Sequence, residues 1–162
     1  MELSKLRGGE LIAAIGGIVL LFSLFFLNWY SVASVSVDTP LGRFSVSGDL
    51  GAWDAEGFLG IVANLVMLAA GVVAVGLAVA TASSRTVAVP VATSALTAGL
   101  GLAAIAMVLG RMLFEPGPNG VVSLQPGIFI ALAGALAIAY GGWQSIQEEG
   151  ATSRRARTAQ PQ

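Results

Sequence analysis

The chain has 162 residues, of which 56% are hydrophobic and only 10% are charged, and its formal net charge is −1. Soluble domains carry about 25% charged residues, so this composition excludes an ordinary soluble fold and favours a chain whose apolar side chains face lipid. Cysteine and histidine are both absent, which excludes disulfides, thiolate or imidazole metal ligands and the commonest general base. The near-balance of charge also gives no reason to expect a nucleic-acid partner.

Four long apolar segments follow one another along the chain, at about 11–27, 58–80, 87–109 and 127–143. Each is uncharged and about 17–23 residues long, which is enough for an α-helix to cross a hydrocarbon core of roughly 30 Å. The sequence therefore predicts an all-α membrane protein, a four-transmembrane-helix bundle with a small extracellular β element. We expect one transmembrane domain over 1–146 and a disordered cytoplasmic tail over 147–162.

The first apolar segment also has features of a signal peptide, because Lys5 and Arg7 precede it. A signal peptide ends in small residues at its cleavage site, whereas this segment ends in Asn28-Trp29-Tyr30. We therefore interpret 11–27 as a retained membrane span.

Lysine and arginine residues in the short loops predict the orientation of the bundle. Most of them fall on the side of the two termini: Lys5, Arg7, Arg85, Arg154, Arg155 and Arg157. Only Arg43 and Arg111 fall on the other side. This bias predicts a multi-pass protein of the cell (plasma) membrane, with cytoplasmic N- and C-termini and with outer loops at 28–57 and 110–126.

The first outer loop, 28–57, has the alternating pattern that is typical of a β-hairpin. Val35 and Val37 alternate with serines, and Phe44 and Val46 do so again after a segment that contains proline and glycine. An isolated hairpin is only marginally stable in water. We therefore expect its apolar face to pack on the helix ends.

The second outer loop offers a third strand for the same sheet at 121–124. The alternative is that the first loop is irregular and lies on the membrane. The residues of the outer sheet and its base that we expect to form an interaction surface are Val35, Val37, Phe44, Val46 and Trp53.

Polar residues are scarce within the spans, and no ionisable residue lies well inside one. This pattern argues against a proton-coupled transporter, since intramembrane charges usually mark proton or substrate paths. Asn64, near the outer end of the second span, is the strongly polar exception. We expect it to form an interhelical hydrogen bond, and contact with a substrate is the alternative.

A candidate polar cluster flanks the outer ends of the second and third spans: Asp54, Glu56, Arg111 and Glu115. Arg111 and Glu115 are four residues apart, in the poorer order for a pair on a helix. Arg111 has Asp54 and Glu56 as alternative partners across the top of the bundle. We expect an exposed ion pair of little energetic consequence, and the alternative is the rim of a polar vestibule for an anionic ligand.

Small residues recur at intervals of four, which lets membrane helices approach closely. These stripes are Ala13 and Gly17 on the first span, Ala95, Gly99 and Ala103 on the third, and Gly127, Ala131, Ala135 and Ala139 on the fourth. The sequence does not say whether they pack within one protomer or between protomers. Aromatic residues at the span ends predict belts at headgroup depth: Trp29, Tyr30 and Trp53 outside, and Tyr140 and Trp143 inside.

Several short segments resemble those of uncharacterised four-span membrane proteins of bacteria: Asn28-Trp29-Tyr30, Gly51-Ala52-Trp53, Pro126-Gly127 and Gly141-Gly142-Trp143. The placement of Trp29 and Gly51-Ala52-Trp53 more distantly resembles the claudin-like tetraspan proteins, which build an extracellular β-sheet from the same loop. The chain departs from that family because it lacks paired cysteines and its loop ends soon after Trp53. The resemblance therefore implies the architecture alone.

These patterns favour a non-enzymatic structural or interaction protein of the cell envelope, surrounded by membrane lipid. We expect it to associate with itself or with another membrane protein through the outer sheet and the small-residue faces. The alternative is a channel-forming or transport-associated oligomer with a pore lined by hydroxyls and backbone. A membrane enzyme would have to use the clustered acids, but no base, nucleophile or metal set completes a site there. We therefore predict no catalytic, cofactor-binding or metal-binding residues.

Overall fold

The computed structural model describes residues 8–40, 42–54, 57–83, 90–114 and 122–158. It contains four helices: α1 (Gly8–Phe26), α2 (Phe58–Ala82), α3 (Pro90–Leu113) and α4 (Pro126–Thr158). All four are long and apolar enough to cross a membrane, which confirms that part of the prediction. Three strands complete the fold: β1 (Asn28–Thr39), β2 (Gly42–Gly51) and β3 (Val122–Leu124).

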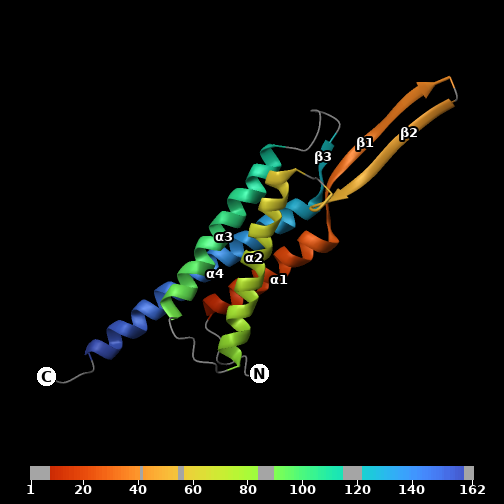
Figure 1. Cartoon of the computed structure of the whole chain (residues 1–162). Helices are drawn as coiled ribbons and strands as arrows, with labels where there is room; N and C mark the ends of the chain where they lie inside the picture. The colour runs from red at the N-terminus through yellow and green to blue at the C-terminus, as the bar shows by residue number, and fades with distance from the viewer. Residues whose placement is uncertain (1–7, 41, 55–56, 84–89, 115–121, 159–162) are drawn as a thin grey trace.

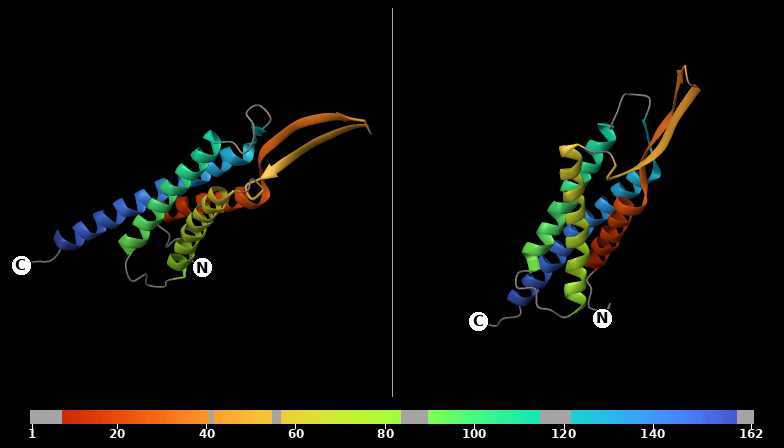
Figure 2. Two further views of the ribbon diagram at one scale, coloured as in Figure 1. Left: turned by 45° about the horizontal axis from the view of Figure 1, so that its top comes forward. Right: turned by 45° about the vertical axis from the view of Figure 1, so that its right-hand side comes forward.

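The helices form a bundle whose two ends differ (Figure 1). The strands gather at one end, which we call the hairpin end, and α1 begins and α4 finishes toward the other, which we call the terminal end. Figure 2 shows the same arrangement from two further directions, with β1 and β2 extending well beyond the helices. Both described ends of the chain thus lie on the opposite side of the bundle from the hairpin.

Two helices extend further than the apolar pattern predicts. Helix α3 continues to Leu113, because the sequence after 109 contains no helix-breaking proline before Pro116. Helix α4 continues to Thr158, so the prediction of a disordered tail is wrong for 147–158, while 159–162 lie outside the described residues. Alanine, glutamate and arginine are strong helix formers. The Gln144 side chain also donates to Glu148 Oε1 at 3.1 Å, one turn along the helix.

Helices α1 and α4 pack so closely that their backbones are in contact. A Cβ atom added at Gly134 would lie 2.8 Å from the Leu20 nitrogen and 2.9 Å from the Gly16 carbonyl oxygen. One added at Gly141 would lie 2.5 Å from the Ala13 nitrogen. Only glycine fits at such positions. This interface is therefore specified by small residues rather than by interlocking large ones.

The small-residue stripes that the sequence predicts differ in their burial in the structure. Ala131 and Ala135 of α4 are fully buried inside the protomer. Ala95 and Gly99 of α3 are exposed, and a Cβ added at Gly99 would meet nothing within 4 Å. The stripe on α4 thus holds the bundle together, whereas that on α3 faces the surroundings of the protomer.

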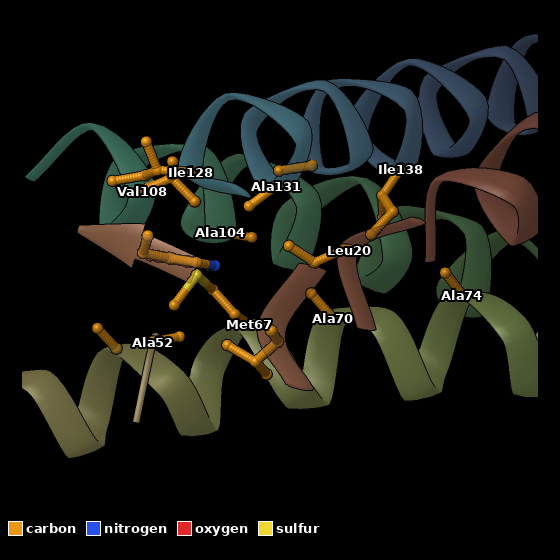
Figure 3. Close-up of a cluster of buried hydrophobic side chains, with 14 of the residues drawn as sticks. Leu20, Ala52, Met67, Ala70, Ala74, Ala104, Val108, Ile128, Ala131 and Ile138 are labelled. Atoms are coloured by element: carbon orange, nitrogen blue, oxygen red, sulfur yellow. The ribbon is translucent and has the colours of Figure 1, made fainter. Parts of the chain in front are cut away.

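Side chains fill the centre of the bundle along its length (Figure 3). The large fully buried ones come from all four helices and include Leu20, Met67, Val108, Ile128 and Ile138. Around them lie alanines, such as Ala70 and Ala104, that let the helices close on one another. The described part of the protomer is therefore packed along its axis rather than hollow.

The three strands form an antiparallel sheet in the order β2-β1-β3. Residues 121–124 were expected to form a third strand, and Val122–Leu124 does pair with β1, opposite Tyr30–Val32. This pairing covers only the base of the hairpin. The expectation that the hairpin lies over the helix ends is wrong beyond that base, since β1 and β2 project away from the bundle (Figures 1 and 2).

We expect Gly134→Val to lower the free energy of unfolding by about 1–3 kcal/mol, the usual cost of overpacking. The new Cβ atom, with its two methyl groups, would collide with the α1 backbone, which cannot move aside without separating the helices. Gly99→Val is the matched control, because its side chain enters open space. Unfolding by denaturing detergent, followed by circular dichroism, measures both. Equal stability of the two variants would contradict the close approach of α1 and α4.

Candidate functional site

A buried polar network lies at the base of the hairpin, where several elements of the fold meet. We call it the hairpin-base network, and its members are Ser23, Trp29, Tyr30, Ala52, Asn64 and Arg111. All six are buried. They come from α1, β1, the segment before α2, α2 itself and α3. The network joins these elements through hydrogen bonds that lie away from the surface.

Arg111 is the centre of this network. Its side chain is 9% exposed and donates to two backbone carbonyls, Ala52 O at 2.7 Å and Gly60 O at 2.9 Å. Its guanidinium carbon lies 5.6 Å from the centre of the Trp29 ring, in cation–π geometry. Arginine suits this role because its planar fork directs several donors at fixed angles and stays charged.

The position of Arg111 corrects the expectation of an exposed ion pair. Arg111 lies in the last turn of α3, not in a loop, and no described carboxylate lies within ion-pair distance of it. Asp54 is exposed and instead accepts a hydrogen bond from the Gly51 nitrogen at 2.8 Å. Glu56 and Glu115, the other members of the predicted polar cluster, lie outside the described residues. Among the described residues, carbonyl dipoles and an aromatic ring stabilise this buried cation.

Trp29 and Tyr30 are core residues rather than parts of an aromatic belt, with 0% and 1% of their surfaces exposed. Trp29 Nε1 donates to Ser23 O at 3.1 Å, and Ser23 Oγ donates to Gly127 O at 2.6 Å. The Tyr30 hydroxyl donates to Arg111 O at 3.1 Å. The start of β1 is thereby tied to α1 and α3, and through Ser23 to the first turn of α4. Tyr140 and Trp143, at the other end, are exposed as a belt requires.

Asn64 bonds to a loop rather than to another helix, which differs from the expectation for it. Its Nδ2 donates to Ala52 O at 3.0 Å, the same carbonyl that accepts from Arg111. Its Oδ1 is buried and has no partner among the described residues. Ala52 O therefore receives two side-chain donors, and the segment before α2 is held from both α2 and α3.

The predicted interaction surface divides into two parts. Cross-strand pairing places Val35 opposite Val46 and Val37 opposite Phe44, so these four positions share one face of the ribbon formed by β1 and β2. Trp53 is separate from them, because it lies at the base, where it is half-buried and stacks on Phe25 at 5.8 Å between ring centres. At the tip, Arg43 Nε donates to Asp38 Oδ1 at 2.7 Å, and this hydrogen bond raises the pKa of the Arg43 guanidinium.

The described polar contacts of this region join chain segments to one another. Within the described segments, no group of three His, Cys, Asp or Glu residues is placed to hold a metal ion. The polar groups of the hairpin-base network bond to backbone carbonyls and so serve to position chain segments. Comparisons with protein-family models, with curated proteins and with solved structures give no match.

We expect Arg111→Met to lower the free energy of unfolding by about 1.5–3 kcal/mol, because it removes the hydrogen bonds from a charged side chain to the Ala52 and Gly60 carbonyls. Arg43→Met is the matched control: it makes the same substitution at an exposed arginine, where loss of an ion pair has little effect. Unfolding by denaturing detergent measures both variants. A loss of stability at Arg43 as large as that at Arg111 would contradict the structural role of the network.

Proposed function

We propose that this chain is a non-enzymatic membrane protein of the cell envelope that associates with a second copy of itself, or with another membrane protein, through its hairpin. The observation that carries this proposal is the projection of β1 and β2 beyond the bundle (Figure 1). Beyond Val32, β1 pairs only with β2 among the described residues. A two-stranded ribbon is marginally stable alone in water, so one this long is best explained by a partner that packs on it.

The ribbon offers two ways to bind. The shared face of Val35, Val37, Phe44 and Val46 places four apolar positions side by side on the ribbon, which suits packing against a similar face. Strand β2 is also the edge of the sheet, with no strand beyond it in the described chain. An open edge accepts a further strand through backbone hydrogen bonds. The apolar face supplies affinity, and the edge supplies a defined register.

The hairpin-base network supports the same function by fixing the direction in which the ribbon projects. Trp29 and Tyr30, the second and third residues of β1, are anchored by hydrogen bonds to the bundle. Arg111 and Asn64 anchor Ala52, directly after β2. Both strands are therefore clamped at the membrane end. Because the hairpin is held rigidly at its base, it loses less conformational entropy when it binds a partner.

We further propose that the hairpin end faces the outside of the cell and that both termini are cytoplasmic, in the plasma membrane. The distribution of lysine and arginine supports this orientation, and an even number of spans is consistent with it. The runner-up function is a channel-forming or transport-associated oligomer. Because the axis of the protomer is filled with side chains, a path for ions would have to run between protomers, where the exposed Ala95 and Gly99 allow close contact.

We expect Val37→Asp and Phe44→Asp to abolish association while the bundle remains folded, because each places a charge on the apolar face. Ser36→Asp, one position from Val37, and Ser47→Asp, three positions from Phe44, are the controls, because the backbone alternation places these exposed residues on the opposite face. Crosslinking in native membranes, followed by mass determination, measures association. Association that survives in both face variants would refute the role of the hairpin.

The orientation is testable because the chain has no cysteine of its own. We expect a membrane-impermeant maleimide to label Ser47→Cys in intact cells, since this position lies on the projecting hairpin. Ala151→Cys, exposed near the far end of α4, should be labelled only after the membrane is permeabilised. The reverse pattern would place the hairpin in the cytoplasm.

A further inference from the structure

A cavity of about 420 Å³ lies between α2 and α3 at the hairpin end. Its wall is formed mostly by residues of α2 and α3, including Gly60, Ala63, Met107, Gly110 and Arg111. Its volume falls within the range of roughly 300–1,000 Å³ that is typical of small-molecule sites. Among these lining residues Arg111 is the one that carries a charge, and the others are mostly apolar. The cavity thus combines a single cationic side chain with a largely apolar wall.

The lining residues are ordered by depth along the bundle. Helix α2 runs inward from Phe58, and α3 ends at Leu113, so Gly60 and Arg111 lie near the hairpin end. Ala63 and Met107 lie about one turn deeper, since each residue of a helix rises about 1.5 Å. Arg111 therefore lies at the hairpin end of the wall, with the apolar Leu59 and Phe114 at the same end, and the wall deeper than Arg111 is apolar. From Arg111 inward, this is the order of headgroup and acyl chain in the membrane leaflet on the hairpin side.

The cavity opens sideways rather than only toward the aqueous phase. Leu59 and Phe114, on its rim, are 80% and 82% exposed, and Ala106 is exposed on the face of α3. Apolar side chains that are this exposed on a membrane-spanning bundle face lipid. A molecule can therefore enter from the bilayer without leaving it.

Arg111 lines the cavity and retains hydrogen-bonding capacity there. A guanidinium has five N–H donors, and one on each terminal nitrogen is bound to a carbonyl, that of Ala52 or Gly60. No described residue accepts from the remaining donors. The two carbonyl bonds hold the guanidinium plane in place, so the remaining donors are preorganised for an oxyanion. A buried cation without a described counter-charge is also stabilised by any anion that binds beside it.

We propose that this cavity binds an anionic phospholipid, with the phosphate at Arg111 and one acyl chain along the apolar wall between α2 and α3. A free phosphate would use only the arginine and leave the apolar wall empty. A second copy of the chain would match the wall, but the described acids at its hairpin end, Asp38, Asp49 and Asp54, are all exposed at the surface rather than set beside an apolar segment. The phospholipid satisfies the charge, the apolar wall and the sideways opening together. The proposal is independent of the function assigned to the hairpin.

Native mass spectrometry of the full chain, released from nanodiscs, tests the proposal. The nanodiscs contain equal amounts of phosphatidylglycerol and phosphatidylcholine with identical acyl chains. We expect the wild-type protein to retain a single phosphatidylglycerol with about tenfold preference, which corresponds to about 1.4 kcal/mol. Equal retention of the two lipids would overturn the proposal, and so would displacement of the bound lipid by inorganic phosphate in millimolar excess.

Gly110→Leu separates the cavity from the stability of the fold. A Cβ at Gly110 would meet nothing within 4 Å, and this residue lines the cavity, so leucine fills the space without displacing the backbone. We expect the retained lipid to fall about tenfold. Gly99→Leu, on the same helix but outside the cavity, should retain it. Unchanged retention in Gly110→Leu would overturn the proposal, as would loss of a protein dimer in that variant without loss of lipid.

Discussion

A backbone carbonyl near the membrane needs an internal donor, because lipid offers none and the cost of leaving it unpaired is several kcal/mol. At the hairpin end of this protein the chain leaves β2 and crosses to α2, and the buried Ala52 O lies in that crossing, outside any helix or strand. Arg111 donates to it from α3, and also to Gly60 O in the first turn of α2. This interaction fixes where the hairpin ends, where α2 begins and how closely α2 and α3 approach. Tyr30 extends it to β1 by donating to the Arg111 carbonyl.

Glycine has two opposite uses in the bundle, and together they determine its shape. At Gly134 and Gly141 the neighbouring helix backbone occupies the place of a side chain, so α1 and α4 form a tight seam. At Gly110 nothing takes that place, and the seam between α2 and α3 opens into the cavity. Membrane helices lack a hydrophobic force that would close such a gap, because lipid fills it as favourably as protein does. An open seam can therefore persist in a stable bundle.

The parts of the structure that the sequence predicts are those that depend on local patterns. Hydropathy locates the four helices, and period-two alternation locates both strands around Val35 and Phe44 and the third strand at Val122. What the sequence does not reveal depends on contacts between distant positions. Trp29 and Tyr30 have the same local pattern whether they face a headgroup or a core, and only the approach of Arg111, 81 residues from Tyr30, decides between them. Ser23 was missed for the same reason, since its partner Gly127 is 104 residues away.

The error about Arg111 shows how one helix boundary changes the interpretation of a site. If α3 ended at 109, Arg111 would lie in a loop, and its natural partners would be the acids nearby. Because α3 continues to Leu113, the helix itself places the guanidinium against Trp29 and between two carbonyls. The desolvated cation then holds the base of the hairpin, and it lines the cavity with donors that no described residue uses. One arginine thus links the element that projects from the membrane to the surface that faces the lipid.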